Sequence, residues 1–310
     1  MKFENRPITF STDKGGFLGH PYFIRQTYEA AGFVKVGIEM VLMPAQIHYL
    51  NQIVRGRMDG SILNGVHGQL VGMGGNPLEH SKGIFDWLLI QVADGMMHKT
   101  YERLTKPFPF AKRNQVMPTG LMIDMIGAKY DKDLYYNVHN GVVEKEYNLY
   151  LEYAKNFNNY SHLTIENGPG HGDLEKTIAL VKRLRTDGAE KVTGTLDLAH
   201  LIIQREGGRD PDENATLRNF MQVLTVLENN HDIFRHIHLP IGLNEHDSIP
   251  MIFLDSFDMF WDRLGAIIQK YDIRVTFENQ HSLIFGVKDE YKEIERLRVI
   301  RHNLNRTGVI

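Results

Sequence analysis

The chain has 310 residues, which is enough for one large α/β domain or two ordinary ones. Lysine and arginine (35) nearly balance aspartate and glutamate (38), so the charge does not favour a nucleic acid as partner, although it leaves one open. The absence of cysteine excludes disulfides, thiolate metal ligands and a cysteine nucleophile. No apolar run approaches the roughly 18 residues of a membrane span, and the first residues lack a secretory pattern, so we expect a cytoplasmic protein without a membrane partner.

Apolar, β-branched runs alternate along the chain with segments of helical periodicity. Eight runs are predicted to be strands: 7–12, 34–42, 60–68, 133–141, 162–168, 191–200, 234–240 and 272–280. Helices are clearest between the later strands and after the last one, at 173–188, 212–230 and 289–305. Alternating strands and helices imply βαβ units and a parallel sheet. Eight such units predict an α/β fold of the (β/α)8 TIM-barrel type.

A doubly wound sheet is the main alternative to the barrel. That fold usually carries a G-x-G-x-x-G turn after its first strand, and the segment "DKGGFLGHP" at 13–21 lacks this spacing. An extended excursion follows the third strand, with helical segments at 83–97 and 120–130 and the basic stretch "KPFPFAKR" at 106–113. In a barrel this excursion would project from the C-terminal face, where it could act as a lid. No linker or low-complexity tract divides the chain, so we predict a single domain over 1–310.

Seven of the eight predicted strands finish on a carboxylate or an imidazole, at the end where (β/α)8 enzymes gather their chemistry. These residues are Glu39, His67, His139, Glu166, Asp197 with His200, His236 or His238, and Glu278. Each has an ordinary alternative, because a lone glutamate is often an ion-pair partner and a lone histidine a structural residue. Taken together, these residues would crowd several negative charges into a narrow ring, which costs free energy of folding unless the charges are compensated. A bound divalent cation would remove the repulsion between the carboxylates.

The second half of the chain resembles the xylose isomerase-like TIM-barrel superfamily, which includes sugar isomerases, ketose 3-epimerases and the endonuclease IV type of nuclease. The segments that carry the resemblance are, in order, "TIENGPG", "GTLDLAH", "HIHLP" and "VTFENQ". The first half matches more loosely, through "VGIEMVL" and the strands of His67 and His139. The resemblance implies a metal-dependent isomerase or epimerase of carbohydrate metabolism, acting on a small sugar or sugar derivative.

In the isomerase and epimerase branch the resemblance also implies residue roles. A divalent metal ion, manganese or zinc with magnesium or cobalt as alternatives, would be held by Glu166, Asp197, His238 and Glu278. Glu166 and Glu278 would be the catalytic pair that moves a proton through a metal-bound enediolate. His200 would bind a substrate oxygen.

The endonuclease IV branch implies a different activity, a zinc phosphodiesterase acting on abasic DNA. Its extra histidines on strands three and four match His67 and His139. It also uses an Asp-x-His pair after strand seven, where "NEHD" at 244–247 offers His246 but places Asn244 at the aspartate position.

Glu39 and the excursion are further candidates for contacts with the substrate. A homo-oligomer stays open, and the aromatic "FDWLL" at 85–89 would suit its interface.

Overall fold

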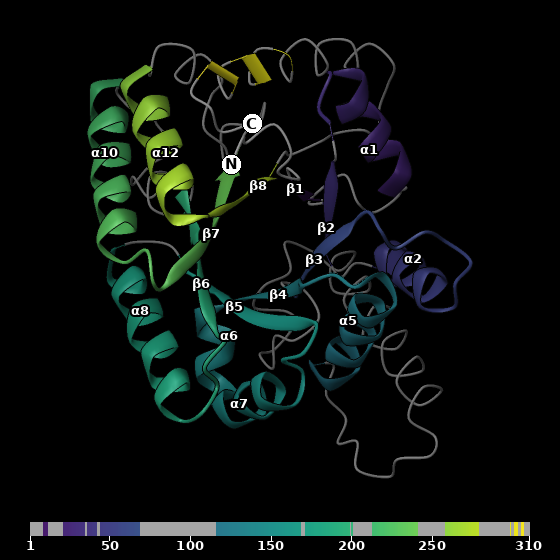
Figure 1. The fold of residues 1–310 in the computed structure, drawn as a ribbon. Coiled ribbons are helices and arrows are strands. Elements are labelled where there is room, and N and C mark those ends of the chain that lie inside the picture. Colours follow the sequence, from purple (N-terminus) through teal and green to yellow (C-terminus); the bar gives the residue numbers. More distant parts are fainter. Residues whose placement is uncertain are drawn as a thin grey trace, which may run out of the picture.

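Eight parallel strands close into a barrel in the computed structural model, and each strand pairs with its neighbours in the sequence (Figure 1). The last strand pairs with the first, which closes the ring. The strands are β1 (Thr9–Ser11), β2 (Gly37–Val41), β3 (Leu63–His67), β4 (Leu134–His139), β5 (Ser161–Glu166), β6 (Thr193–Asp197), β7 (Phe234–Pro240) and β8 (Arg274–Glu278). All eight predicted strands are therefore confirmed, and so is the (β/α)8 architecture.

The structure describes most of the barrel and its helices. The described residues are 9–11, 21–34, 36–41, 44–68, 116–168, 171–198, 200, 213–240, 258–278, 298, 301–302 and 305–306. The predicted helix at 83–97, the basic stretch at 106–113 and most of the helix predicted at 289–305 lie outside them. Within the described ranges, no helix has the length and apolar character to cross a membrane.

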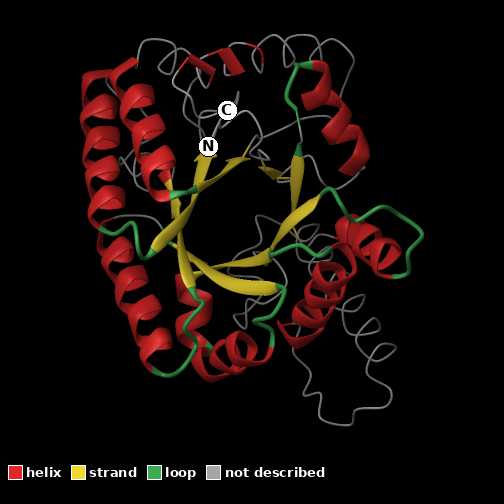
Figure 2. Ribbon diagram, in the orientation of Figure 1, coloured by secondary structure: helices red, strands yellow, loops and turns green. Residues whose placement is uncertain are grey.

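Helices surround the barrel on its outer side (Figure 2). They are α1 (Pro21–Ala30), α2 (Pro44–Val54), α5 (Val116–Tyr130), α6 (Asn140–Lys145), α7 (Tyr147–Asn156), α8 (His171–Thr186), α10 (Glu213–Asn229) and α12 (Asp258–Tyr271). Two of them, α8 and α10, confirm the helices predicted at 173–188 and 212–230. Two residues after the end of α8, Gly188 adopts a φ of +99°, a conformation that glycine tolerates best.

The apolar core lies between the strands and the helices. Successive side chains of a strand point to opposite faces, so Leu163 and Ile165 of β5 pack outward with the core while Thr164 and Glu166 point into the barrel. On the facing side, α8 buries Leu174 as part of its apolar stripe. Burial of the outer face fixes the register of each strand and so determines which side chains line the interior.

The barrel interior is polar below its C-terminal end. The hydroxyl groups of Thr164 and Thr195 lie 2.7 Å apart, and those of Tyr135 and Thr276 lie 3.0 Å apart. Gly65 of β3 makes room for the tyrosine ring, because a Cβ atom there would stand 2.3 Å from it. These neutral pairs form a floor beneath the charged residues at the strand ends.

Candidate metal centre

Five of the seven strands that were predicted to end on a carboxylate or an imidazole do so. Because the strands are parallel, these ends lie at one side of the barrel, which we call the rim. The terminal residues are His67 of β3, His139 of β4, Glu166 of β5, Asp197 of β6 and Glu278 of β8. Glu39 and His238 lie two residues before the ends of β2 and β7. The register places His238 level with Asp197 at the rim. Glu39 is level with Gly65 and therefore deeper in the barrel.

Glu166 lies at the centre of this arrangement, with a side chain that is 1% exposed. Its Oε2 atom lies 2.9 Å from Nε2 of His67 and 3.4 Å from Nδ1 of His238. Its Oε1 atom faces two other imidazoles, with Nδ1 of His139 at 3.6 Å and Nδ1 of His200 at 3.7 Å. The two carboxylate oxygens thus serve different sets of histidines, an inner and an outer one. We call these residues together with Asp197 the Glu166 cluster.

The electrostatics of the Glu166 cluster keep its central carboxylate ionised. Burial raises the pKa of Glu166, but the positive charges of His139, His67 and His238 outweigh burial, and the pKa lies well below its usual value of 4.5. A buried carboxylate that stays negative is a strong ligand for a cation.

Asn167 fixes the ends of β5 and β6 relative to each other. Its Oδ1 atom accepts a hydrogen bond of 2.8 Å from the backbone N–H of Asp197, and its Nδ2 donates to the carbonyl of Asp197 at 3.2 Å. The amide therefore sets the distance between the Glu166 and Asp197 carboxylates.

Asn167 also orients His200. Nδ1 of His200 lies 2.8 Å from the backbone carbonyl of Asn167, which can only accept, so this nitrogen carries a proton. The same nitrogen lies 3.3 Å from Oδ2 of Asp197. The proton on Nδ1 leaves Nε2 as the nitrogen that can accept or ligate, so the 26% exposed side chain is able to contact a substrate or to bind a metal ion through Nε2.

Three groups of side chains in the described part of the chain could hold a metal ion, because each brings its ligand atoms within 4.8 Å of one another. The groups are Glu39–His67–His238, His67–His139–Glu166 and Glu166–Asp197–His200. Mixed carboxylate and imidazole donors suit zinc and manganese. The second and third groups both contain Glu166, whose two oxygens face different neighbours. The donors are therefore enough for one metal ion, and a second ion could use the remaining histidines.

The structure places most of the sequence-predicted site residues near one another. Glu166 contacts His238, and Asp197 is paired in register with His238 on the neighbouring strand. Three of the four predicted metal ligands therefore gather at the rim. The side chain of Glu278, the fourth, and the whole of His246 lie outside the described residues.

Of the two histidines in "HIH", only His238 reaches the Glu166 cluster. His236 lies deeper, with its ring centroid 4.4 Å from that of Tyr135 and 5.4 Å from that of His162. Burial lowers the pKa of His236 well below its usual value, and the charges of His162, Arg274 and His238 add to the effect. His236 is therefore a neutral ring that packs in the barrel floor.

Asn137 is a site residue that the sequence reasoning missed. It lies two residues before His139 on β4 and so points into the barrel on the same face. Its side-chain Nδ2 donates a short hydrogen bond to Oε2 of Glu166. The alternation that places His139 inside the barrel also predicts an inward Asn137, but an uncharged amide does not by itself indicate a metal or catalytic site.

Comparisons with known proteins support the architecture. The sequence matches no protein-family model and no curated protein. The structure is similar to that of 3-keto-D-glucoside 4-epimerase from E. coli, with a TM-score of 0.50 and 10% identity over 95% of this chain and 99% of the other. It is also similar to endo-β-1,4-glucanase B from Bacillus halodurans, with a TM-score of 0.49 and 9% identity over 97% of this chain and 60% of that one. At 10% identity the likeness to the epimerase structure shows the fold alone, a parallel α/β barrel with helices on its outside.

Proposed function

We propose that this protein is a divalent-metal-dependent isomerase or epimerase that acts on a sugar or sugar derivative by proton transfer. The observation that supports it most is the buried, ionised carboxylate of Glu166, which lies at the rim between imidazoles and next to Asp197. Such a group serves a reaction that needs a cation and a carboxylate base at one carbon.

The electrostatics of Glu166 suit a proton acceptor or a metal ligand, and they do not suit the general acid of a glycoside hydrolase. A glycoside hydrolase needs a carboxyl group whose pKa is raised, so that it can protonate the leaving oxygen. The pKa of Glu166 is lowered instead, because the neighbouring histidines outweigh its burial. Glu166 is therefore in the form that accepts a proton.

The residues present fit a metal ion. We propose Glu166, Asp197, His238 and Glu278 as its ligands, and manganese or zinc as the ion, because the set mixes carboxylates with an imidazole. A bound divalent ion would polarise the substrate carbonyl as a Lewis acid. Asn137 and Asn167 hold the first two carboxylates in place through hydrogen bonds to Glu166 and to the backbone of Asp197.

The chain's own residues would carry the proton transfer. Glu166 and Glu278 are the last residues of β5 and β8, two strands that are not neighbours in the ring. One of them would take a proton from the carbon beside the carbonyl, and the other would return a proton to the substrate. His200, with Nδ1–H held by the carbonyl of Asn167, would orient a substrate oxygen at the mouth of the site.

Solvent deuterium exchange tests this mechanism. With a panel of ketoses and keto-sugar derivatives in D2O, we expect the wild-type protein to place deuterium on the carbon next to the carbonyl. Glu278→Gln should slow this exchange by about 100-fold or more, because general acid–base catalysis contributes that much, while metal stays at least partly bound. Glu152→Gln, on an exposed position of α7, is the matched control and should exchange like wild type. Exchange at the wild-type rate in Glu278→Gln contradicts the two-glutamate mechanism.

A second candidate function is a zinc phosphodiesterase of the endonuclease IV type. The observation that favours it is the His67–His139–Glu166 group, which adjoins Asp197 through a shared carboxylate and resembles the donor set of a two-metal site. This candidate predicts cleavage of duplex DNA at an abasic site and roughly two or three zinc ions per chain, whereas the isomerase needs about one. Asn244 at the position of an expected aspartate argues against it.

A further inference from the structure

Glu39 is a carboxylate buried in the barrel, and neither of its oxygens accepts a hydrogen bond of standard geometry from any described residue. Its side chain is 0% exposed, and it lies in β2 level with Gly65, two residues deeper than His67. A buried charge of this kind is costly unless another group compensates it. The reaction proposed above makes no use of Glu39, so its burial in the barrel needs a separate explanation.

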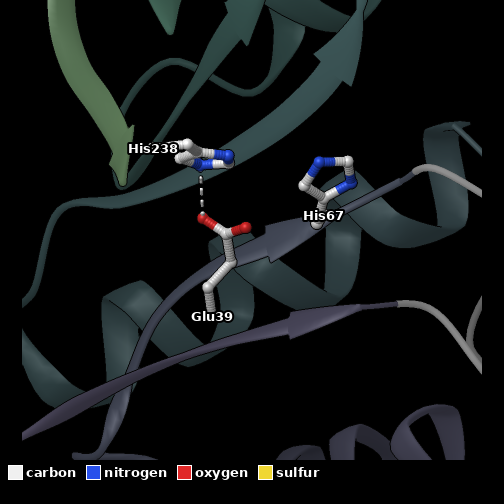
Figure 3. A group of neighbouring side chains, drawn as sticks. All are labelled: Glu39, His67 and His238. Carbon is white, nitrogen blue, oxygen red and sulfur yellow. Dashed lines mark ion pairs between the residues drawn. The ribbon is translucent and has the colours of Figure 1, made fainter. Parts of the chain in front are cut away.

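His238 is the group that Glu39 faces most directly. Nε2 of His238 lies 3.4 Å from Oε2 of Glu39, as the dashed line in Figure 3 shows. The opposite nitrogen, Nδ1, lies 3.4 Å from Oε2 of Glu166. The imidazole of His238 therefore stands between two carboxylates, one in the Glu166 cluster and one beneath it.

Two other polar side chains lie near this contact, Tyr135 and Asn137. Burial raises the pKa of Tyr135 well above its usual value, and the negative charge of Glu39 and a hydrogen-bonding interaction with Glu39 add to the effect. The hydroxyl of that tyrosine is bonded to Thr276 at 3.0 Å. Asn137 also approaches Nε2 of His238, at 3.5 Å, but its amide makes its short hydrogen bond to Glu166.

We propose that Glu39 is a positioning residue for His238, accepting the Nε2–H hydrogen bond and thereby directing the Nδ1 lone pair toward Glu166 and the metal. This proposal rests on the proposed function, which makes His238 a metal ligand. Histidines that bind metals usually donate their other N–H to a carboxylate, which fixes the tautomer and strengthens the ligand. Glu39 would supply this support from inside the barrel, away from the substrate.

Glu39 could instead be a ligand of its own ion, together with His67 and His238. Two contacts argue against this alternative. Nε2 of His67 is already 2.9 Å from Glu166, and an ion on the Glu39 side of His238 would compete with the proton that links the two residues. The alternative also makes a different prediction, which is the loss of one whole ion when Glu39 is replaced.

Titration of the purified, metal-free chain with Mn2+ tests the proposal. Glu39→Gln keeps the shape of the side chain, and we expect it to weaken Mn2+ binding by about 10–100-fold. The number of ions bound per chain should not change. The metal-free variant should melt close to the wild-type temperature, because the glutamine oxygen can still accept the Nε2–H hydrogen bond of His238. A purely structural role would lower the melting temperature together with the affinity. Glu152→Gln on the surface should change neither quantity.

A double-mutant cycle shows whether the effect passes through His238. In a His238→Gln background, Glu39→Gln should produce no further loss of Mn2+ affinity, because the residue that it positions is gone. Full additivity of the two losses overturns the proposal, as does wild-type affinity in Glu39→Gln or the loss of one whole ion. A wild-type chain that binds no Mn2+ defeats the proposed function and the role of Glu39 with it. Wild-type binding with an unaffected Glu39→Gln variant defeats only the role of Glu39.

Discussion

Glu166→Gln is expected to remove tight metal binding and the activity that depends on it. The substitution deletes the negative charge toward which four histidines converge, and the amide offers a metal only a weak neutral oxygen. Loss of an outer hydrogen-bond partner alone costs about 10–100-fold in affinity, so loss of a direct anionic ligand should exceed about 100-fold. Metal content after dialysis against limiting Mn2+ or Zn2+ measures the effect.

The controls for Glu166→Gln separate a chemical effect from unfolding. Circular dichroism and the metal-free melting curve should show a folded barrel, because the short hydrogen bond from Asn137 can still be accepted by the glutamine oxygen. Glu152→Gln, exposed on α7, should keep full metal content. If Glu166→Gln retains metal at wild-type affinity, the Glu166 cluster is not the metal centre.

Acidification is expected to release the metal more steeply than a single proton would. Histidine must be neutral to bind a metal, and its ordinary pKa is about 6.5. The pKa of Glu166 lies well below 4.5 because of the histidines around it, so the carboxylate stays ionised while they take up protons. Binding measured between pH 7.5 and 5.5 should therefore weaken by more than about tenfold per pH unit.

The metal-free protein should respond to acid in a lower range. The pKa of Glu166 is depressed by folding, so its contribution to stability is present above its ordinary value of 4.5 and is lost as the pH falls through the lowered value. Glu166→Gln should flatten the fall in unfolding free energy below pH 4.5, which urea titrations at several pH values measure. A wild-type acid profile in Glu166→Gln shows that this carboxylate is not the one that titrates.

The sequence predicted the strands because their patterns depend on local alternation. In β5, Leu163 and Ile165 alternate with Thr164 and Glu166, and burial of the first pair requires the second pair to face inward. The same alternation placed carboxylates and imidazoles at the rim. Helices α8 and α10 could be predicted in the same way, because an apolar stripe at helical spacing must face the core.

Depth within the barrel could not be predicted, because it depends on the stagger between strands. Alternation puts both His236 and His238 inside, but only the register shows that His238 pairs with Asp197 while His236 pairs with Thr195 below it. Glu39 looked like a residue that could contact substrate, and the register places it level with Gly65, beneath His67. A one-residue pattern cannot distinguish a rim residue from one in the floor.

The central claim is that Glu166 and its neighbours form a metal centre. Anomalous diffraction from crystals of the protein loaded with Mn2+ tests this claim most directly. The account predicts a strong peak bonded to Glu166, with Asp197 and His238 among the other ligands. A second peak between His67, His139 and Glu166 would favour the phosphodiesterase over the isomerase. A well-ordered barrel with saturating Mn2+ and no peak on Glu166 would contradict the claim.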